Sequence, residues 1–340
     1  MNGKHHESER AVDDARIWIV SDGKAGDETQ CIGVAEALER AYEIRRVAPR
    51  APWSWLMPYG PVDPRDAPHR PTSPIRPPFP EIAIASGRRA VAYLRAIKEA
   101  SGGRTFTVFL KDPRIGTRAA DLIWVAEHDD LRGENVVVTA TGPHRFSAER
   151  IAAARAAPLP GIAGLPHPRV AVLVGGDSRH YRFNDLDVSG FVDGLKRLDA
   201  AGAHFMITGS RRTPVPLHDA LRAFTAMPGH LMWDGTGENP LLQYLANADA
   251  VVATADSANM IGEALATGRA IHVFHPSGGH RKFDLFLAAL GEIGAVHPFP
   301  GPLKTTTYEP IDSTPRIAAA IRWHHARHRA ALGDAPHAPA

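Results

Sequence analysis

The chain has 340 residues, of which 44% are hydrophobic and 22% are charged, and its formal net charge at pH 7 is +2. These values are typical of a globular protein with two hydrophobic cores, and they exclude a dedicated nucleic-acid binder with a large basic surface. No apolar run approaches the ~18 residues that a membrane-spanning helix needs. The single cysteine, Cys31, excludes an internal disulfide and a thiolate metal cage.

The N-terminal stretch MNGKHHESERAVDDAR is polar and partly acidic, unlike a secretory or mitochondrial leader. We therefore expect a cytoplasmic protein. Residues 1–15 and 333–340 are predicted to be disordered, because the ends of a chain are seldom ordered unless they pack on a domain.

Short apolar runs alternate with helical patterns along the whole chain. In the first half, strands are predicted in RIWIV, EIAIAS, TFTVFL, DLIWVAE and NVVVTA, and helices over residues 29–41 and 90–100. In the second half, strands are predicted in VAVLVGG, AHFMITGS, LMWDG, DAVVATA and AIHVFH, and helices over 191–200 and 259–267. This alternation places helices on both faces of parallel sheets, so the sequence predicts an α/β protein of two Rossmann-like, doubly wound domains.

The predicted domains divide the chain near its middle. The first domain is expected over residues 16–155 and the second over residues 169–313. Residues 156–168 are rich in proline, glycine and alanine, which is typical of a linker. A last helix, over residues 314–332, follows the final strand of the second domain, and we expect it to return to the first.

The proline-dense segment over residues 49–80 predicts a long loop. Near its start, in RRVAPRAPWSWLMPYG, the basic residues Arg45, Arg46 and Arg50 lie close to Trp53 and Trp55. Cations beside tryptophans suit a membrane interface or a hydrophobic acceptor groove. Alternatively, the aromatic side chains pack under the loop as a small satellite core.

The stretch VSDGKAGDETQ lies between the first predicted strand and the first predicted helix. Gly23 and Gly26 permit close approach of a ligand, and the helix N-terminus offers free N–H groups. Lys24 is followed by alanine, and the glycine spacing differs from a Walker P-loop and from the dinucleotide fingerprint. Two interpretations stay open: an acceptor- or phosphate-binding loop, completed by Ser86 and Arg88 of IASGRR, or a tight turn without a ligand.

The stretch AVLVGGDSRHYRF runs from a buried strand into Gly175 and Gly176, which is how a parallel strand delivers its end to a ligand loop. Further along, Asp256 and Ser257 open a predicted helix, and Glu263 lies about two turns inside it. A glutamate there could accept both hydroxyls of a ribose whose phosphates bind at the helix start. In the alternative interpretation Ser257 is a plain helix cap and Glu263 a solvated surface acid.

Histidines offer only weak metal signals. His324 and His328 are one helical turn apart, and His5 and His6 form a terminal pair, but neither pair has carboxylates at zinc spacing. The sequence therefore predicts no bound metal and no cofactor.

Two resemblances to known families follow from these motifs. The string from Asp249 to Phe274 resembles the nucleotide-sugar donor motif of GT-B glycosyltransferases. The stretches SDGKAGDETQCIGVAEAL, IASGRR, DPR, VGGDSRHYRF, TGSRRTP, WDGTGENP and TADSANMIGEALATG together resemble the mitochondrial-fission, elongated-mitochondria family and its bacterial members. The resemblance implies two Rossmann-like domains that face a cleft, a GT-B-like fold. Members of the family often carry His or Ser where this chain has Asp27.

The resemblance also implies a site for a nucleotide-diphosphate sugar in the interdomain cleft, with the donor held by the second domain. Glu263 would hold the ribose, and the Gly175-Gly176 loop would hold the diphosphate. The implied donor-binding residues are Gly175, Gly176, Ser178, Arg179, Ser210, Arg211, Arg212, Trp233, Asp256, Ser257 and Glu263. The acids and bases near predicted strand ends, Asp22, Asp27, Glu28 and His144, are the candidate catalytic residues. GT-B enzymes generally work without a bound metal.

Three functions remain open on this sequence. The first is transfer of the sugar to an unidentified acceptor, with a lipid or membrane surface at the inner face of the membrane as one candidate, reached through Trp53 and Trp55. The second is a non-catalytic adaptor, because eukaryotic members of the family are implicated in recruiting a dynamin-type fission GTPase to mitochondria. The third is a sugar-nucleotide epimerase of the same fold, which would need a pair of carboxylates in the cleft. A fold by itself does not separate them.

Overall fold

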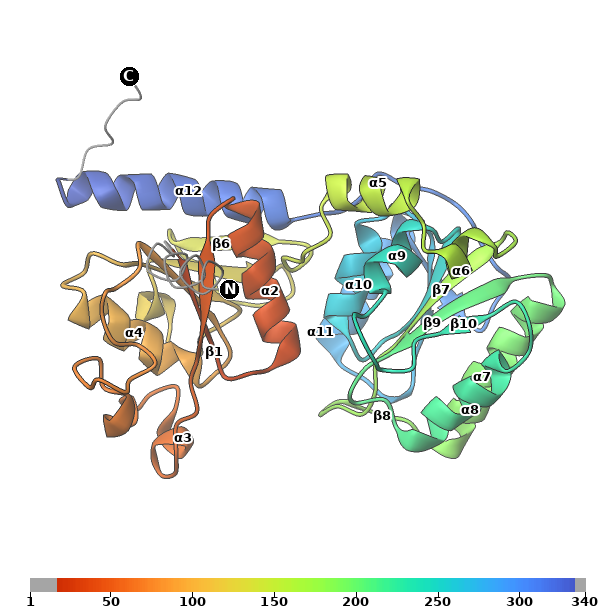
Figure 1. Ribbon diagram of the computed structural model, residues 1–340, viewed down its shortest axis with the longest axis horizontal. Coiled ribbons are helices and arrows are strands. Elements are labelled where there is room, and N and C mark those ends of the chain that lie inside the picture. Colours follow the sequence, from red (N-terminus) through yellow and green to blue (C-terminus); the bar gives the residue numbers. More distant parts are fainter. Residues whose placement is uncertain (1–16, 334–340) are drawn as a thin grey trace, which may run out of the picture. The chain divides into compact units, whose positions relative to one another are not determined.

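The computed structural model describes residues 17–333 and consists of two compact units (Figure 1). The first unit runs to Arg145 and resumes at Ser313, and the second covers Phe146–Asp312. The segments predicted to be disordered, residues 1–15 and all of the tail after Gly333, lie outside the described residues. The predicted α/β architecture of two Rossmann-like domains is confirmed.

The boundary between the units differs from the predicted linker over residues 156–168. That segment belongs wholly to the second unit and contains a short helix, α6 (Pro160–Ala163), which follows α5 (Ala148–Ala156). A proline suits the first turn of a helix, and Ile162 and Leu165 are buried in the core of the second unit. The proline- and glycine-rich composition therefore marks turns of a packed segment.

The first unit contains a parallel sheet with the order β2-β1-β3-β4-β5-β6. Its strands are β1 (Ile17–Ser21), β2 (Tyr42–Arg46), β3 (Ile82–Ser86), β4 (Phe106–Leu110), β5 (Leu122–Ala126) and β6 (Val136–Thr139). Successive side chains of a strand point to opposite faces of the sheet, so each strand contributes side chains to the hydrophobic core on each face. Ile17 and Ile19 pack toward α2 (Ala25–Ala37), whereas Trp18 packs toward α4 (Ala90–Ala100).

The C-terminal helix α12 (Thr314–Ala331) is part of the first unit, where Figure 1 shows it in blue. Ile317 and Ile321 are fully buried on the same face of the sheet as α2. At the start of α12, Thr314 Oγ1 accepts a hydrogen bond of 3.1 Å from the backbone N–H of His144. Both ends of the described chain therefore contribute to one hydrophobic core.

The second unit contains a parallel sheet with the order β10-β9-β7-β11-β12-β14. Its strands are β7 (Arg169–Val174), β9 (His204–Gly209), β10 (Leu231–Met232), β11 (Ala250–Thr254), β12 (Ile271–Phe274) and β14 (Val296–Phe299). One face is covered by α7 (Asp185–Ala200) and α8 (Val215–Thr225), and the other by α9 (Leu241–Ala246), α10 (Ala258–Leu265) and α11 (Arg281–Glu292). A two-stranded ribbon, β8 (Tyr181–Arg182) with β13 (Ser277–Gly278), lies beside the Gly-Gly loop.

Each sheet has one point at which its strand order reverses. In the first unit this point lies between β1 and β3, and in the second it lies between β7 and β11. At such a point the connections leave in opposite directions, so a crevice opens outside the carboxyl ends of the two strands, and ligands of open α/β sheets bind there. Four of the loops that the sequence singled out follow β1, β3, β7 and β11 and lie at these two reversal points, whereas the loops with Arg211 and Trp233 follow β9 and β10.

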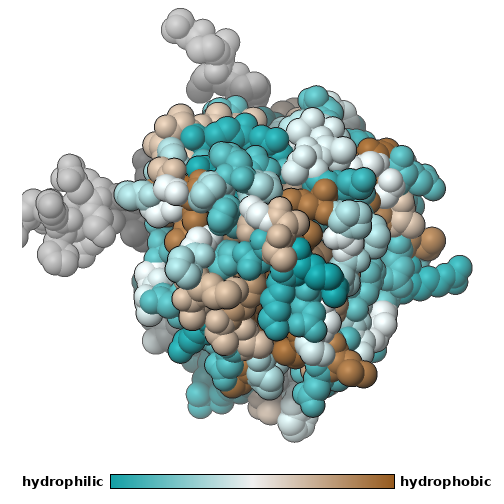
Figure 2. All heavy atoms as spheres, turned by 90° about the vertical axis from the view of Figure 1, so that its right-hand side faces the viewer, coloured by the Kyte–Doolittle hydropathy of each residue, from teal (hydrophilic) through white to brown (hydrophobic). Residues whose placement is uncertain are grey.

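Among residues 17–333, no helix combines the length and the apolar composition needed to cross a membrane. On the face of the molecule that Figure 2 shows, apolar residues lie in small groups between polar ones. Such scattered apolar groups are ordinary for a protein surface.

Candidate functional site

The Gly-Gly loop after β7 is closed by side chains from two neighbouring segments. The N–H of Gly175 donates to Thr254 Oγ1 at 2.8 Å, and the N–H of Gly176 donates to Asp256 Oδ2 at 2.9 Å. A Cβ atom on Gly175 would lie 2.1 Å from the Asp256 carboxylate, and one on Gly176 would lie 1.9 Å from the carbonyl oxygen of Arg212. Both glycines are therefore required by close approach. The two amides that were predicted to hold a diphosphate bind acceptors of the protein itself.

Asp256 and Arg212 hold this loop together. The Asp256 side chain is fully buried, and it accepts hydrogen bonds from Arg212 Nη2 at 2.9 Å and from Thr254 Oγ1 at 2.6 Å. The Arg212 guanidinium also donates to the carbonyl oxygens of Gly176 and Asp177, at 3.2 and 3.0 Å. A buried carboxylate needs such a paired and hydrogen-bonded environment. Both side chains, predicted as nucleotide ligands, are thus engaged in the loop.

Two other predicted arginines remain available for a phosphate. Arg179 and Arg211 are exposed, and neither takes part in a hydrogen bond or ion pair with another residue of the described range 17–333. Arginine recognises phosphate through paired N–H donors. Arg179 and Arg211 are therefore the two cations on the loops after β7 and β9 that have N–H groups available to a phosphate.

The remaining donor-side residues serve local structure. Ser178 Oγ accepts from the N–H of Tyr181 at 3.1 Å, and Ser210 Oγ donates to the carbonyl oxygen of Gly175 at 2.9 Å. Trp233 is half-buried, and its Nε1 donates to the carbonyl oxygen of Thr236 at 2.7 Å. These contacts set the shape of the loops after β7, β9 and β10.

Glu263 is a buried carboxyl that pairs with none of the residues that the structure describes. It lies on α10, which begins just after β11, and the residue is only 9% exposed. Burial raises the pKa of Glu263 to about 8, and no hydrogen bond or ion pair within residues 17–333 reaches its side chain. The alternative that Glu263 is a solvated surface acid is therefore wrong, whereas Ser257 does cap α10 by accepting from the N–H of Met260. A buried polar group left without a partner costs stability, and such groups concentrate at functional sites.

The reversal point of the first sheet holds a second carboxyl of this kind. The Asp22 side chain follows β1 and is 2% exposed, and its nearest cation is Lys24, whose Nζ lies 3.4 Å from Oδ2. Neither carboxylate oxygen accepts a hydrogen bond from the described residues. Gly87, just after β3, has a φ of +89°, and a Cβ there would lie 3.0 Å from Asp27 Oδ2 and 3.7 Å from Asp22 Oδ1. Only glycine fits this position, because the carboxylates of Asp22 and Asp27 both lie next to its backbone.

The other predicted acids and bases differ from Asp22 in their surroundings. Asp27 pairs with Lys111, and Glu28 accepts from Ser21 Oγ at 3.0 Å and from Arg46 Nη2 at 2.8 Å. His144 is 4% exposed beneath the start of α12. Asp22 therefore differs from Asp27 and Glu28, because none of the described residues donates a hydrogen bond to its carboxylate.

Sequence reasoning missed Lys111 and the role of Arg46. Lys111 directly follows β4, and its φ of +86° is unusual for a residue with a Cβ. Its position at the carboxyl end of a parallel strand was a signal that could have revealed it.

The predicted acceptor loop divides into structural and exposed parts. Gly23 has a φ of +84° and donates its N–H to Ser21 Oγ at 3.0 Å, and Gly26 lies in the first turn of α2. Ser86 is buried and donates to the carbonyl oxygen of Leu110 at 3.1 Å. Arg88 is exposed and donates to the carbonyl oxygen of Ser54 at 3.2 Å, in the proline-dense loop. Within the described part of the chain, no three His, Cys, Asp or Glu residues form a group that could hold a metal ion.

The chain is similar in sequence to a known protein family. The sequence profile described as "Mitochondrial fission ELM1" matches residues 25–324, most of the sequence. The chain belongs to the mitochondrial fission ELM1 family. A member of this family from Arabidopsis thaliana, named mitochondrial fission protein ELM1, is 26% identical over 270 residues, which are 72% of this chain and 63% of that protein. A protein of Rickettsia prowazekii named uncharacterized protein RP120 is 27% identical over 169 residues, or 46% of this chain and 48% of that protein.

The ELM1-family chain thus matches about half to two thirds of the length of these relatives. Among solved structures it is similar to the UDP-GlcNAc 2-epimerase of Methanocaldococcus jannaschii, with a TM-score of 0.52 at 9% identity, over 90% of this chain and 99% of that one. At such low identity the similarity concerns the fold, which is GT-B-like.

Proposed function

We propose that this ELM1-family protein binds a nucleotide-diphosphate sugar at the reversal point between β7 and β11 and transfers the sugar to a hydroxyl group of an acceptor. The observation that carries the proposal is Glu263, a buried carboxyl with a raised pKa and no partner among the described residues, five residues past the start of the helix that follows β11. A ribose diol would supply the two hydrogen bonds that this carboxyl lacks.

The surroundings of Glu263 suit the rest of a nucleotide diphosphate. The N-terminus of α10 carries the positive end of the helix dipole, which favours phosphate. Arg179 and Arg211 are exposed cations on the loops after β7 and β9, and Trp233 follows β10. Because the GT-B-like fold is shared with a protein whose name specifies UDP-GlcNAc, uridine diphosphate sugars are the first probes to test.

Among the predicted catalytic residues of the first unit, Asp22 has the surroundings best suited to a proton acceptor. In the transfer, the acceptor oxygen forms a bond to the anomeric carbon, the bond from that carbon to the diphosphate breaks, and the proton of the acceptor hydroxyl must leave. A carboxylate without hydrogen-bond donors is a suitable proton acceptor, whereas the carboxylates of Asp27 and Glu28 are held by Lys111 and Arg46.

The test replaces the Glu263 carboxyl without changing its shape. Glu263→Gln should weaken binding of UDP-GlcNAc at least tenfold in calorimetry, because the amide cannot accept from both ribose hydroxyls as a carboxylate does, and a charged acceptor is worth about 1.5–3 kcal/mol per bond. Since glutamine resembles the neutral form that the raised pKa favours at pH 7, the melting temperature should stay nearly unchanged.

Glu292→Gln, at the exposed end of α11, is the matched control and should bind as the unaltered protein does. Equal binding by the Glu263 variant would contradict the assignment of this residue. An unaltered protein that binds no UDP, GDP, dTDP or ADP sugar at millimolar concentration would contradict the function itself and favour a non-catalytic adaptor.

The paired carboxylates beside Gly87 support epimerisation as a second candidate. Asp22 and Asp27 both approach the same glycine, and an epimerase needs such a pair to remove and return a proton on the sugar ring. Product analysis separates the two reactions, because an epimerase converts UDP-GlcNAc into a stereoisomer without an acceptor, whereas a transferase forms UDP and a glycosylated acceptor only when an acceptor is present.

A further inference from the structure

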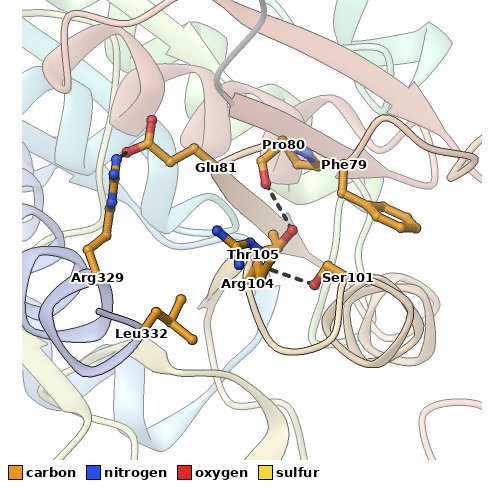
Figure 3. A pocket seen from close by; sticks show the side chains of 8 residues that line it. All are labelled: Phe79, Pro80, Glu81, Ser101, Arg104, Thr105, Arg329 and Leu332. Atoms are coloured by element: carbon orange, nitrogen blue, oxygen red, sulfur yellow. Dashed lines mark hydrogen bonds and ion pairs between the residues drawn. The ribbon is translucent and has the colours of Figure 1, made fainter. Parts of the chain in front are cut away.

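The two ends of the first sheet hold carboxylates in opposite surroundings. At the amino end, Glu81 borders a cavity of about 560 Å³, where Figure 3 shows Arg329 reaching toward it, and its oxygens lie 3.1 Å from Arg329 Nη1 and 2.9 Å from Arg40 Nη1. At the carboxyl end, Asp22 is 2% exposed, and none of residues 17–333 donates a hydrogen bond to either of its oxygens. A buried carboxylate without donors destabilises the fold, and such groups concentrate at ligand sites.

The Asp22 carboxylate lacks hydrogen-bond donors but has positive charge close to it. Lys24 Nζ lies 3.4 Å from Asp22 Oδ2, and Lys111 Nζ lies 2.5 Å from Asp27 Oδ1. Each of these two carboxylates thus has a lysine beside it, and the two ammonium groups would repel a metal ion or an ammonium ligand. The ligand that suits Asp22 is therefore a neutral molecule that donates hydrogen bonds.

The ends of three adjacent strands surround this carboxylate. Asp22 follows β1, Gly87 follows β3 and Lys111 follows β4. A Cβ on Gly87 would lie 3.7 Å from Asp22 Oδ1 and 3.0 Å from Asp27 Oδ2, so the absence of a side chain at Gly87 leaves room beside both carboxylates. Lys24 is 61% exposed, so its side chain can turn away when a ligand reaches Asp22.

We propose that Asp22 binds two neighbouring hydroxyl groups of a carbohydrate, and that this carbohydrate is the acceptor of the sugar transfer. An ionised carboxylate only accepts hydrogen bonds, and its two oxygens can each take one from adjacent hydroxyls of a sugar ring. Lys111 has further N–H donors besides the one that contacts Asp27, and an oxygen of the same ligand can accept from them. The role as acceptor rests on the proposed function, whereas the binding of the carbohydrate does not.

The same contact accounts for the proton of the transfer. One bound hydroxyl gives its proton to Asp22 while its oxygen forms a bond to the anomeric carbon of the donor, and the nucleoside diphosphate leaves with the electron pair of the broken bond. The second hydroxyl stays bound and holds the reacting one in place. Asp22 thus positions the acceptor and takes its proton.

The experiment measures carbohydrate binding to the full chain by calorimetry, without a nucleotide. The probes are the methyl glycosides of glucose, galactose, mannose and N-acetylglucosamine at tens of millimolar, and at least one should bind saturably. Methyl tetra-O-methylglucoside keeps the ring but has no hydroxyl donor, and it should not bind. Asp22→Asn should weaken the binding at least tenfold, because the amide replaces one acceptor oxygen by a donor. Glu99→Gln, at an exposed position near the end of α4, is the matched control and should bind as the unaltered protein does.

The melting temperature shows whether Asp22 binds a ligand or supports the fold. Replacing a structural carboxylate removes hydrogen bonds, so the melting temperature would fall. Asp22 has no donor to lose among the described residues, and a neutral amide is less costly to bury than a charge, so Asp22→Asn should melt at the same temperature or higher. A lower melting temperature, equal glycoside binding by Asp22→Asn, equal binding of the tetra-O-methyl analogue, or no saturable binding of any methyl glycoside would each overturn the proposal.

Two further titrations separate this proposal from its alternatives. Mg²⁺ alone should not bind, and saturable Mg²⁺ binding that Asp22→Asn abolishes would overturn the assignment of a neutral ligand. Glu263→Gln should bind the methyl glycosides as the unaltered protein does. A protein that binds methyl glycosides through Asp22 but binds no nucleotide sugar would keep the carbohydrate site and lose its role in transfer, so the two proposals fail separately.

Discussion

At the residue scale, Glu263 links the fold to the proposed chemistry. A surface glutamate at the same position would be ionised, hydrated and uninformative. Burial instead raises its pKa to about 8, so the group is mostly neutral at pH 7 in the free protein. We therefore expect the protonation state of Glu263 to change when a ligand binds.

The affinity for a uridine diphosphate sugar should depend on pH in a defined direction. Two hydroxyl donors stabilise the ionised carboxylate, so the bound state has a lower Glu263 pKa than the free state. Below pH 8, binding must then release a proton, and the affinity should rise with pH and level off above about pH 8. Calorimetry at neutral pH in two buffers of different ionisation enthalpy measures the released proton. A binding enthalpy that is the same in both buffers would contradict this, and Glu263→Gln should abolish the buffer dependence.

At the element scale, the proline-dense loop has both buried and exposed apolar side chains. Met57 and Ile75 are buried against the first sheet, as a satellite core requires. Trp55 is 74% exposed and Tyr59 72% exposed, and they lie with Leu56 on and after the short helix α3 (Trp53–Leu56). The nearby arginines are not free to meet lipid headgroups.

Each of those arginines has a partner in the first unit. Arg50 makes two hydrogen bonds to Asp63, of 2.8 and 2.7 Å, and Arg46 pairs with Glu28. Arg45 stacks on a tryptophan of β1 and pairs with a glutamate of β2. Contact with a membrane would therefore rest on the exposed aromatic and apolar side chains more than on these cations.

Replacing the exposed apolar side chains tests whether this loop contacts a membrane. Trp55→Ser together with Leu56→Ser should reduce sedimentation with anionic vesicles, because about 25 cal/mol is lost for each Å² of apolar surface that no longer enters the interface. Trp323→Ser, which removes a tryptophan that is 54% exposed on α12, is the matched control and should sediment like the unaltered protein. If the loop variant sediments as much as the unaltered protein, or if neither protein sediments, this loop does not contact a membrane.

The elements that the sequence predicted well are those whose pattern is long and periodic. The helix predicted over 90–100 coincides with α4, and the helix predicted over 314–332 is one residue longer than α12. The helix predicted over 29–41 begins four residues earlier, at Ala25. Two strands of the large sheets that the sequence analysis did not predict, β2 and β14, form edges of those sheets, and the short strands β8 and β13 were also not predicted. Edge strands are half-exposed, so β2 carries charged residues and β14 contains a proline, and neither reads as a continuous apolar run.

At the scale of the whole molecule, the two units differ in how the chain builds them. The second unit is continuous from Phe146 to Asp312, whereas the first needs α12 from the far end of the sequence. The α12 residues Ile317 and Ile321 are fully buried on the first sheet, and removing a helix of this kind would expose that face to water.

Truncation before Ser313 should therefore affect the units unequally. We expect the shortened protein to lose the cooperative melting transition of the first unit in calorimetry, or to show it at a much lower temperature, while the second unit melts as before. The separate piece 146–312 should fold by itself, with helical and strand signals in circular dichroism. Unchanged thermograms after truncation, or a piece 146–312 that stays unfolded, would contradict this organisation.

The amino-acid sequence by itself determined the alternation of strands and helices, the glycine loops after β1 and β7, and the place of Glu263 on a helix after a buried strand. These features are local, because they depend on periodicity and on residues within a few positions of one another. Only the tertiary structure decided that Asp256 and Arg212 close the Gly-Gly loop, that none of residues 17–333 donates a hydrogen bond to Asp22, and that α12 completes the first core. Those contacts join residues that are distant in the chain, and whether a charged group is paired, buried or free depends on the neighbours that folding brings to it.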